Sequence, residues 1–176
     1  MPVPDFSPGE VLTAAAMDSI GLWLVKTQTV GAGVSSVVVT GAFSATYDNY
    51  LVTYNGGTSS SSGIIGLRLG ATATGYRCSY IFTSWNNTVG ASGSSTDTTF
   101  TRFGRHAGSN ASTGYGMLLS PFLSSPTRFI GSDISTTDGG SFVGYMDNST
   151  SYTEFTLIPN TGTLTGGTIR VYGYRN

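Results

Sequence analysis

Short runs of β-branched and aromatic residues, separated by turns rich in Gly, Ser and Asn, recur from residue 34 to the end of the chain. Runs of this length with such boundaries predict β-strands. About ten strands are expected, at residues 34–40, 49–55, 63–69, 76–85, 98–105, 114–122, 128–135, 141–147, 152–159 and 167–175. Many short strands without a repeat of fixed period predict an all-β fold, an antiparallel, jelly-roll-like β-sandwich.

One short N-terminal helix is expected in addition to the strands, over residues 9–21. Leu12, Ala16 and Ile20 recur at four-residue spacing with Met17 beside them, so that a helix would carry one apolar stripe. A helix of about two turns is marginal in isolation. It must therefore dock on something, whether its own sheet, a symmetry mate or a larger assembly.

The low charge of the chain limits the classes of function that it can serve. Charged residues make up 10% of the 176 residues, while 39% are hydrophobic and 12% aromatic. The apolar share indicates a chain that folds, and a hydroxyl-rich surface with little charge is typical of proteins that pack side by side or bind neutral sugars. With a net charge of −1 and a single lysine, the basic surface of a nucleic-acid binder is missing.

No secretion signal or membrane span is expected either. The N-terminus has no basic region ahead of an apolar one, and the apolar run at 22–25 is far too short to cross a bilayer. The chain is therefore expected to be made in the cytoplasm and to insert in no membrane.

Few residues could carry out chemistry. His106 and Cys78 are the only histidine and cysteine, which excludes a Cys/His zinc site and the two-histidine metalloprotease motif. Phosphate-binding and Gly-x-Ser-x-Gly motifs are also missing. We expect no metal, no cofactor and no enzymatic activity. A Ser/His/Asp triad through His106 remains open by composition alone, but its neighbourhood favours a histidine in a loop or interface, and Cys78 is expected to be a half-buried strand thiol.

Paired carboxylates, the catalytic groups of glycosidases, offer an alternative. The candidates in the second half of the chain are Asp133, Asp138, Asp147 and Glu154. Their spacing singles out no pair, so a glycan hydrolase stays a secondary hypothesis.

Aromatic residues beside polar loops are candidates for binding a glycan, because rings stack on sugar faces while amides and hydroxyls bond to the edges. Trp85 is expected at a strand end and leads into Asn86 and Asn87, and Tyr115 borders a second polar loop. These four residues form the predicted ligand-binding set. Tyr76, Cys78, Tyr80 and Phe82 alternate on the preceding run and are better read as core.

Three segments near the ends resemble small virion proteins of tailed bacteriophages, particularly phages of actinobacteria. The segment FSPGEVLTAAAMDSIG (6–21) is similar to the opening of their minor tail proteins. The segment VSSVVVTGAFSATYDNYLVTYNG (34–56) is similar to phage structural proteins in which a phrase like its FSATYDNY precedes a core strand. GTLTGGTIRVYGYRN (162–176) is similar to the strand that closes phage fibre and decoration domains. The middle of the chain, 57–150, resembles nothing specific.

The resemblance implies a non-enzymatic virion structural protein, with residues 1–26 as an attachment arm and 27–176 as a β-domain. The first hypothesis is a minor tail protein that contacts a host-surface glycan; a capsid decoration or head-fibre protein is the alternative. Its partners would be other virion proteins and further copies of itself, by analogy in a homotrimer. The expected attachment residues are Phe6, Val11, Leu12, Ala16, Met17, Ile20 and Trp23.

Overall fold

The computed structural model describes residue 11, residues 21–108 and residues 110–174. Apart from Val11 and Gly21, the predicted helix over 9–21 lies outside these residues. So do five of the predicted attachment residues: Phe6, Leu12, Ala16, Met17 and Ile20. Val11 is exposed, and no helix occurs in the described part of the chain, so the structure gives the helix no support.

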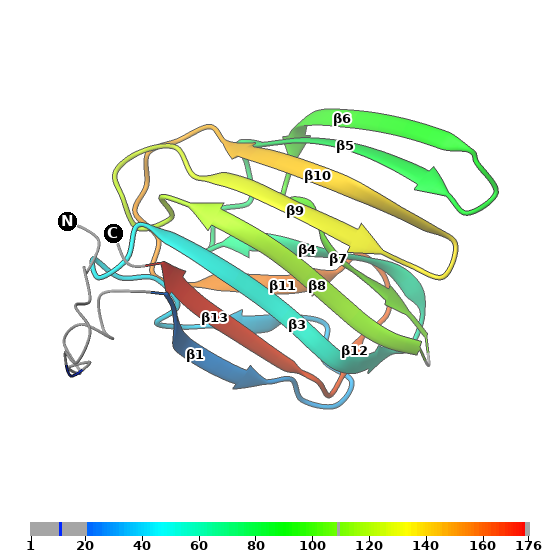
Figure 1. The fold of residues 1–176 in the computed structure, drawn as a ribbon, viewed down its shortest axis with the longest axis horizontal. Coiled ribbons are helices and arrows are strands. Elements are labelled where there is room, and N and C mark those ends of the chain that lie inside the picture. Colours follow the sequence, from blue (N-terminus) through cyan, green and yellow to red (C-terminus); the bar gives the residue numbers. More distant parts are fainter. Residues whose placement is uncertain (1–10, 12–20, 109, 175–176) are drawn as a thin grey trace.

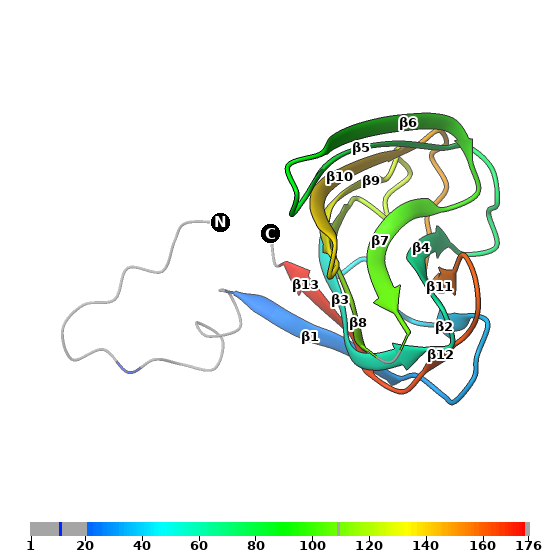
Figure 2. The ribbon, with the colours of Figure 1, turned by 90° about the vertical axis from the view of Figure 1, so that its right-hand side faces the viewer.

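The described residues contain thirteen strands, and every strand pair is antiparallel. The all-β prediction is therefore confirmed. The strands lie in two layers that face each other, as the two orthogonal views show (Figures 1 and 2). Because no described helix exists, none is long and apolar enough to cross a membrane.

The larger layer runs from one edge to the other in the order β1–β13–β3–β8–β9–β10–β5–β6. Its strands are β1 (Leu22–Thr29), β13 (Thr168–Tyr174), β3 (Asn49–Ser59), β8 (Asn110–Leu119), β9 (Arg128–Ile134), β10 (Asp138–Met146), β5 (Tyr76–Ser84) and β6 (Val89–Asp97). Along β8 and β9 alternate side chains are buried and accessible. One face of this layer therefore covers the core and the other faces outward.

The smaller layer has the order β2–β11–β4–β7 and joins the larger one where β7 pairs with β8. Its strands are β2 (Val37–Val39), β11 (Phe155–Pro159), β4 (Ser62–Leu69) and β7 (Phe100–Ala107). A further short strand, β12 (Leu164–Thr165), pairs with the end of β3. Figure 2 shows β7, β4 and β11 opposite β3 and β8, with β5 and β6 curving over one end.

Aromatic rings fill the space between the layers. Phe129 lies 5.3 Å from Phe100 and 5.2 Å from Phe142 between ring centroids, and none of the three has more than 1% of its surface exposed. The buried tyrosines satisfy their hydroxyls within the fold: Tyr54 donates to the carbonyl of Gly166, and Tyr76 donates to that of Thr72. Such paired hydroxyls let large rings occupy the core without a desolvation penalty.

All ten predicted runs coincide with strands, but the prediction of about ten was too low. It omitted β6, whose small polar residues lack an alternating pattern, and the two-residue β12. It also omitted β1, which begins inside the predicted arm and pairs with β13. Trp23, a predicted attachment residue, lies in β1 and is half-buried.

Candidate functional site

The two layers divide at β8, which forms a fork. One edge of β8 pairs with β3 along nearly its whole length. The other edge pairs with β7 up to Gly114 and with β9 from Gly116 onward. Tyr115 therefore lies at the branch point, where the edge of β8 passes from one layer to the other.

Glycines allow the close packing that the fork requires. A Cβ at Gly116 would lie 2.1 Å from the ring of Phe129, and one at Gly114 would lie 2.3 Å from the ring of Phe103. Both rings are fully buried and have nowhere to move. Glycine inside a strand commonly marks a sharp bend or a close approach of this kind.

A hollow of about 610 Å³ opens at the fork. Its lining side chains are mostly uncharged: hydroxyls from Thr53, Thr113, Ser132, Ser135 and Thr136, amides from Asn55 and Asn110, and apolar surface from Tyr115, Ile134 and Ala111. Tyr115 has 49% of its surface exposed. An accessible ring among hydroxyls and amides can stack on one face of a ligand and bond to its edges.

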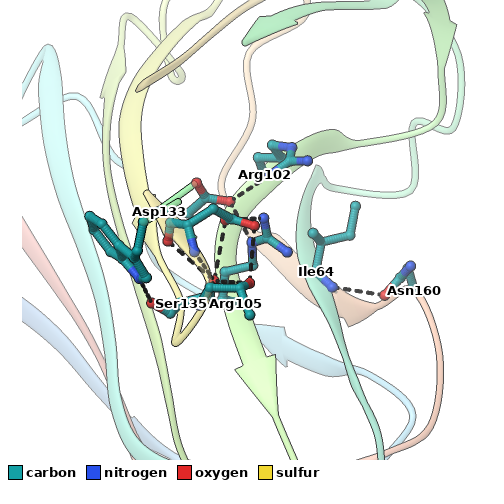
Figure 3. A network of polar contacts seen from close by, with 9 residues as sticks. Ile64, Arg102, Arg105, Asp133, Ser135 and Asn160 are labelled. Atoms are coloured by element: carbon teal, nitrogen blue, oxygen red, sulfur yellow. Dashed lines mark hydrogen bonds and ion pairs between the residues drawn. The ribbon is translucent and has the colours of Figure 1, made fainter. Parts of the chain in front are cut away.

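Among the described residues, Arg105 is the only charged one that lines the hollow. Its positive charge is balanced by two carboxylates of the same chain. Its Nε donates to Asp133 Oδ2 at 3.0 Å, and its Nη2 donates to Asp138 Oδ1 at 2.5 Å. Arg102 Nη1 also donates to Asp133 Oδ2, at 3.0 Å. Figure 3 shows both arginines reaching from β7 toward Asp133 on β9.

This cluster of two arginines and two aspartates has a formal charge of zero and little contact with water. Asp133 is 4% exposed, and the guanidinium of Arg102 lies 3.8 Å from the centre of the Tyr80 ring. Ser135 Oγ donates to the carboxylate of Asp138, which ties the β9–β10 turn to the cluster. Buried pairs of this kind hold their geometry because an unpaired charge there would be costly.

Trp85, predicted from the sequence as a ligand-binding residue, does not line the hollow but bonds to Ser135, which does. Its indole Nε1 donates to the carbonyl of Ser135 at 3.3 Å, and 63% of its surface is exposed. Because Ser135 lines the hollow, this hydrogen bond places the indole of Trp85 beside it. Tyr115, thirty residues away in sequence, lines the same hollow as Ser135.

Asn86 and Asn87, the other two predicted ligand-binding residues, are exposed in the β5–β6 turn and do not line the hollow. Asn87 adopts φ +67°, and the side chain of Asn86 accepts a hydrogen bond from the backbone N–H of Thr88. Both residues therefore shape the turn, as asparagines commonly do.

Of the four carboxylates considered for glycan hydrolysis, Asp133 and Asp138 come together, and both accept hydrogen bonds from the guanidinium of Arg105. Asp147 instead forms an exposed ion pair with Arg77. Glu154 lies outside both groups, just before β11. No group of residues that could hold a metal ion occurs in the described ranges.

His106 and Cys78 are both buried strand residues. His106, expected in a loop or interface, is instead in β7 with 2% of its surface exposed, and its Nδ1 lies 2.7 Å from the carbonyl oxygen of Ser61. Burial raises the pKa of the Cys78 thiol to about 12, which makes it unreactive at neutral pH.

Sequence reasoning missed most of the hollow, including Arg105, Thr53 and Ser132. The strand glycines at 104, 114, 116 and 131 were the available signal, because four of them inside predicted strands indicate a sharp change of direction. Their pairing, Gly104 with Gly114 and Gly116 with Gly131, is what locates the fork.

Comparisons with known proteins give no identity. No protein family matches the chain, and no curated protein is significantly similar to it. A solved structure described as "Structure of infectious bursal disease virus Gx strain" aligns with 12% sequence identity and a TM-score of 0.12. The alignment covers the whole of this chain and 46% of that chain. A similarity this low is no guide to fold or function.

Proposed function

We propose that this protein is a non-enzymatic structural protein of a tailed-phage particle, a minor tail protein whose β-domain binds a neutral glycan on the host surface. The hollow at the fork of β8 is the proposed binding site. The observation that carries the proposal is the exposed ring of Tyr115 in a cavity lined by hydroxyls and amides.

The chemistry of the lining favours a neutral sugar. Stacking on Tyr115 suits the apolar face of a pyranose ring, and the surrounding Thr, Ser and Asn side chains can donate to and accept from its hydroxyls. Trp85 beside the hollow offers a second ring for a neighbouring sugar.

The ion-pair cluster argues against an acidic ligand. A uronic or sialic acid would need a cation, and the guanidinium of Arg105 is already engaged by Asp133 and Asp138. Arg170, which forms no ion pair with a described residue, opposes Thr53 from β13 but does not line the hollow. The donors of Arg105 therefore act as oriented, charge-balanced groups, which suits a hydroxyl better than a carboxylate.

The wider assignment rests on the resemblance of both chain ends to virion proteins. In this proposal the two layers form a jelly-roll-like sandwich that is presented as a homotrimer on the particle surface, and residues 1–26 attach it to other virion proteins. The buried aromatic core between two antiparallel layers supports the sandwich.

Binding to an array of neutral and acidic oligosaccharides from host envelopes, followed by titration calorimetry on the strongest neutral binder, tests the site. Tyr115→Ala should lower affinity about tenfold, since one stacking contact provides about 1.4 kcal/mol. Tyr145→Ala is the matched control, because Tyr145 is a half-buried β10 tyrosine that does not line the hollow. Equal affinities of the two variants, or selection of acidic glycans only, would refute the site.

Immunogold electron microscopy of intact particles, with an antibody against residues 57–150, tests the location. Label at the tail tip is the expected result. Label spread over the head would instead identify a decoration protein.

A further inference from the structure

A continuous row of apolar side chains crosses the outer face of the larger layer. Directly opposed residues on six adjacent strands form it: Leu24 (β1), Tyr172 (β13), Leu51 (β3), Met117 (β8), Ile130 (β9) and Val143 (β10). Leu24, Ile130 and Val143 each have about half of their surface exposed, and the others are half-buried. We call these six residues the outer row. A continuous apolar strip on a surface indicates a contact site.

The charges beside the outer row are positive. Arg128 and Arg170 lie on the same outward face, one alternation to either side of it. Neither forms an ion pair with another described residue. A partner with an apolar stripe and carboxylates would match both features.

The first twenty residues of this chain combine an apolar stripe with carboxylates, as such a partner would. They contain Asp5, Glu10 and Asp18 and no lysine or arginine. The helix predicted from their sequence carries the stripe Leu12, Ala16 and Ile20, which needs a surface to dock on.

We infer that residues 9–20 dock as a helix on the outer row of the same copy, with Leu12, Ala16 and Ile20 against the β1–β8 part of the row. The helix fixes the arm to the β-domain, so that within the proposed attachment arm, residues 1–26, only the residues ahead of the helix reach another virion protein. This inference does not depend on glycan binding at the fork.

The dimensions agree with docking on the same copy. Gly21, with φ +106° and open space around its Cα, immediately precedes Leu22 of β1 and allows the chain to reverse there. From Leu12 to Ile20 a helix rises about 12 Å, and the three strand spacings from β1 to β8 measure about 14 Å. The short connection also gives the segment an effective concentration in the millimolar range at its own row.

Disulfide trapping tests the contact in the full-length chain, in a Cys78→Ala background. The reporter pair is Leu12→Cys with Met117→Cys, and the position control pairs Leu12→Cys with Val38→Cys, an exposed residue on β2 of the other layer. Under a mild oxidant the reporter pair should close within one copy at least about tenfold faster than the control, because cysteines must approach closely to bond. Ala16→Cys with Leu51→Cys serves as a second pair if the first variant fails to show a cooperative melting transition.

Two single substitutions in the predicted helix test whether its apolar stripe makes the contact. Ala16→Glu puts a charge on the apolar face of the predicted helix, whereas Ala14→Glu puts the same charge on the opposite face. We expect Ala16→Glu to slow trapping of the reporter pair about tenfold, the equivalent of about 1.4 kcal/mol, and Ala14→Glu to leave it within twofold.

Three outcomes would overturn the inference. The first is trapping of the reporter pair no faster than that of the position control, and the second is equal slowing by the two glutamates. The third is a disulfide that links two copies, seen as a band of twice the mass on a non-reducing gel, which would assign the outer row to self-association instead.

Discussion

Replacing Asp133 by Asn should destabilise the fold far more than the same change at Asp147, although both carboxylates form ion pairs with arginine. Asp133 is 4% exposed and accepts hydrogen bonds from Arg102 and Arg105, each at 3.0 Å. Asp147 pairs with Arg77 at the surface, where about half of each side chain is in water. Because both substitutions replace an aspartate by asparagine, comparing their effects on stability isolates the effect of burial.

The magnitude follows from the partners that each substitution leaves behind. Removing one member of a buried ion pair costs about 3–5 kcal/mol. Arg105 would keep Asp138 and Arg102 would keep the ring of Tyr80, so we expect the lower end, about 3 kcal/mol. An exposed pair contributes about 0–1 kcal/mol, which sets the expected loss for Asp147→Asn.

Urea unfolding followed by far-UV circular dichroism measures both values. For a chain of this length, 3 kcal/mol corresponds to a lowering of Tm by roughly 10 °C. The slope of the free energy of unfolding against urea should stay unchanged, since the same surface is exposed on unfolding. A cost for Asp133→Asn within 1 kcal/mol of that for Asp147→Asn would refute the view that the buried cluster holds β7 against β9.

Two further predictions concern Gly116 and Cys78. Gly116→Ala should lower the free energy of unfolding in urea by about 1–3 kcal/mol, because its Cβ would overlap the buried ring of Phe129. Gly93→Ala is the control and should be neutral or stabilising, because its Cβ would meet the carbonyl oxygen of Cys78 at an ordinary 3.5 Å. A larger loss of stability for Gly93→Ala than for Gly116→Ala would contradict the close approach at the fork. Burial raises the pKa of Cys78 from 9.0 to about 12, so between these pH values only the unfolded thiol ionises and the free energy of unfolding should fall by up to about 1.4 kcal/mol per pH unit. Cys78→Ala should remove that part of the slope, and identical slopes for the two proteins would count against a buried, neutral thiol.

The sequence alone was a good guide wherever side chains alternate against a single core. The runs that became β3 and β5 carry apolar residues at every second position, and that pattern selects one face without any knowledge of the partner strand. It failed for β6, whose small Gly, Ala and Ser residues show no alternating pattern, and the strand exists because its backbone pairs with β5. Pairing of this kind depends on a neighbour, and a local pattern does not contain it.

The candidate site divides in the same way. The residue types that suit a neutral glycan, above all Trp85 and Tyr115 beside polar loops, were determined by the sequence, as was the scarcity of charge. That Trp85 bonds to a residue of the hollow that Tyr115 lines was decided by the pairing of β10 with β5 and β9. That Arg105 lies between two carboxylates beside this hollow was decided by the division of β8 between β7 and β9. Composition and periodicity are properties of neighbouring residues, whereas a fork joins strands far apart in the chain, and only the packing of the two layers brings them together.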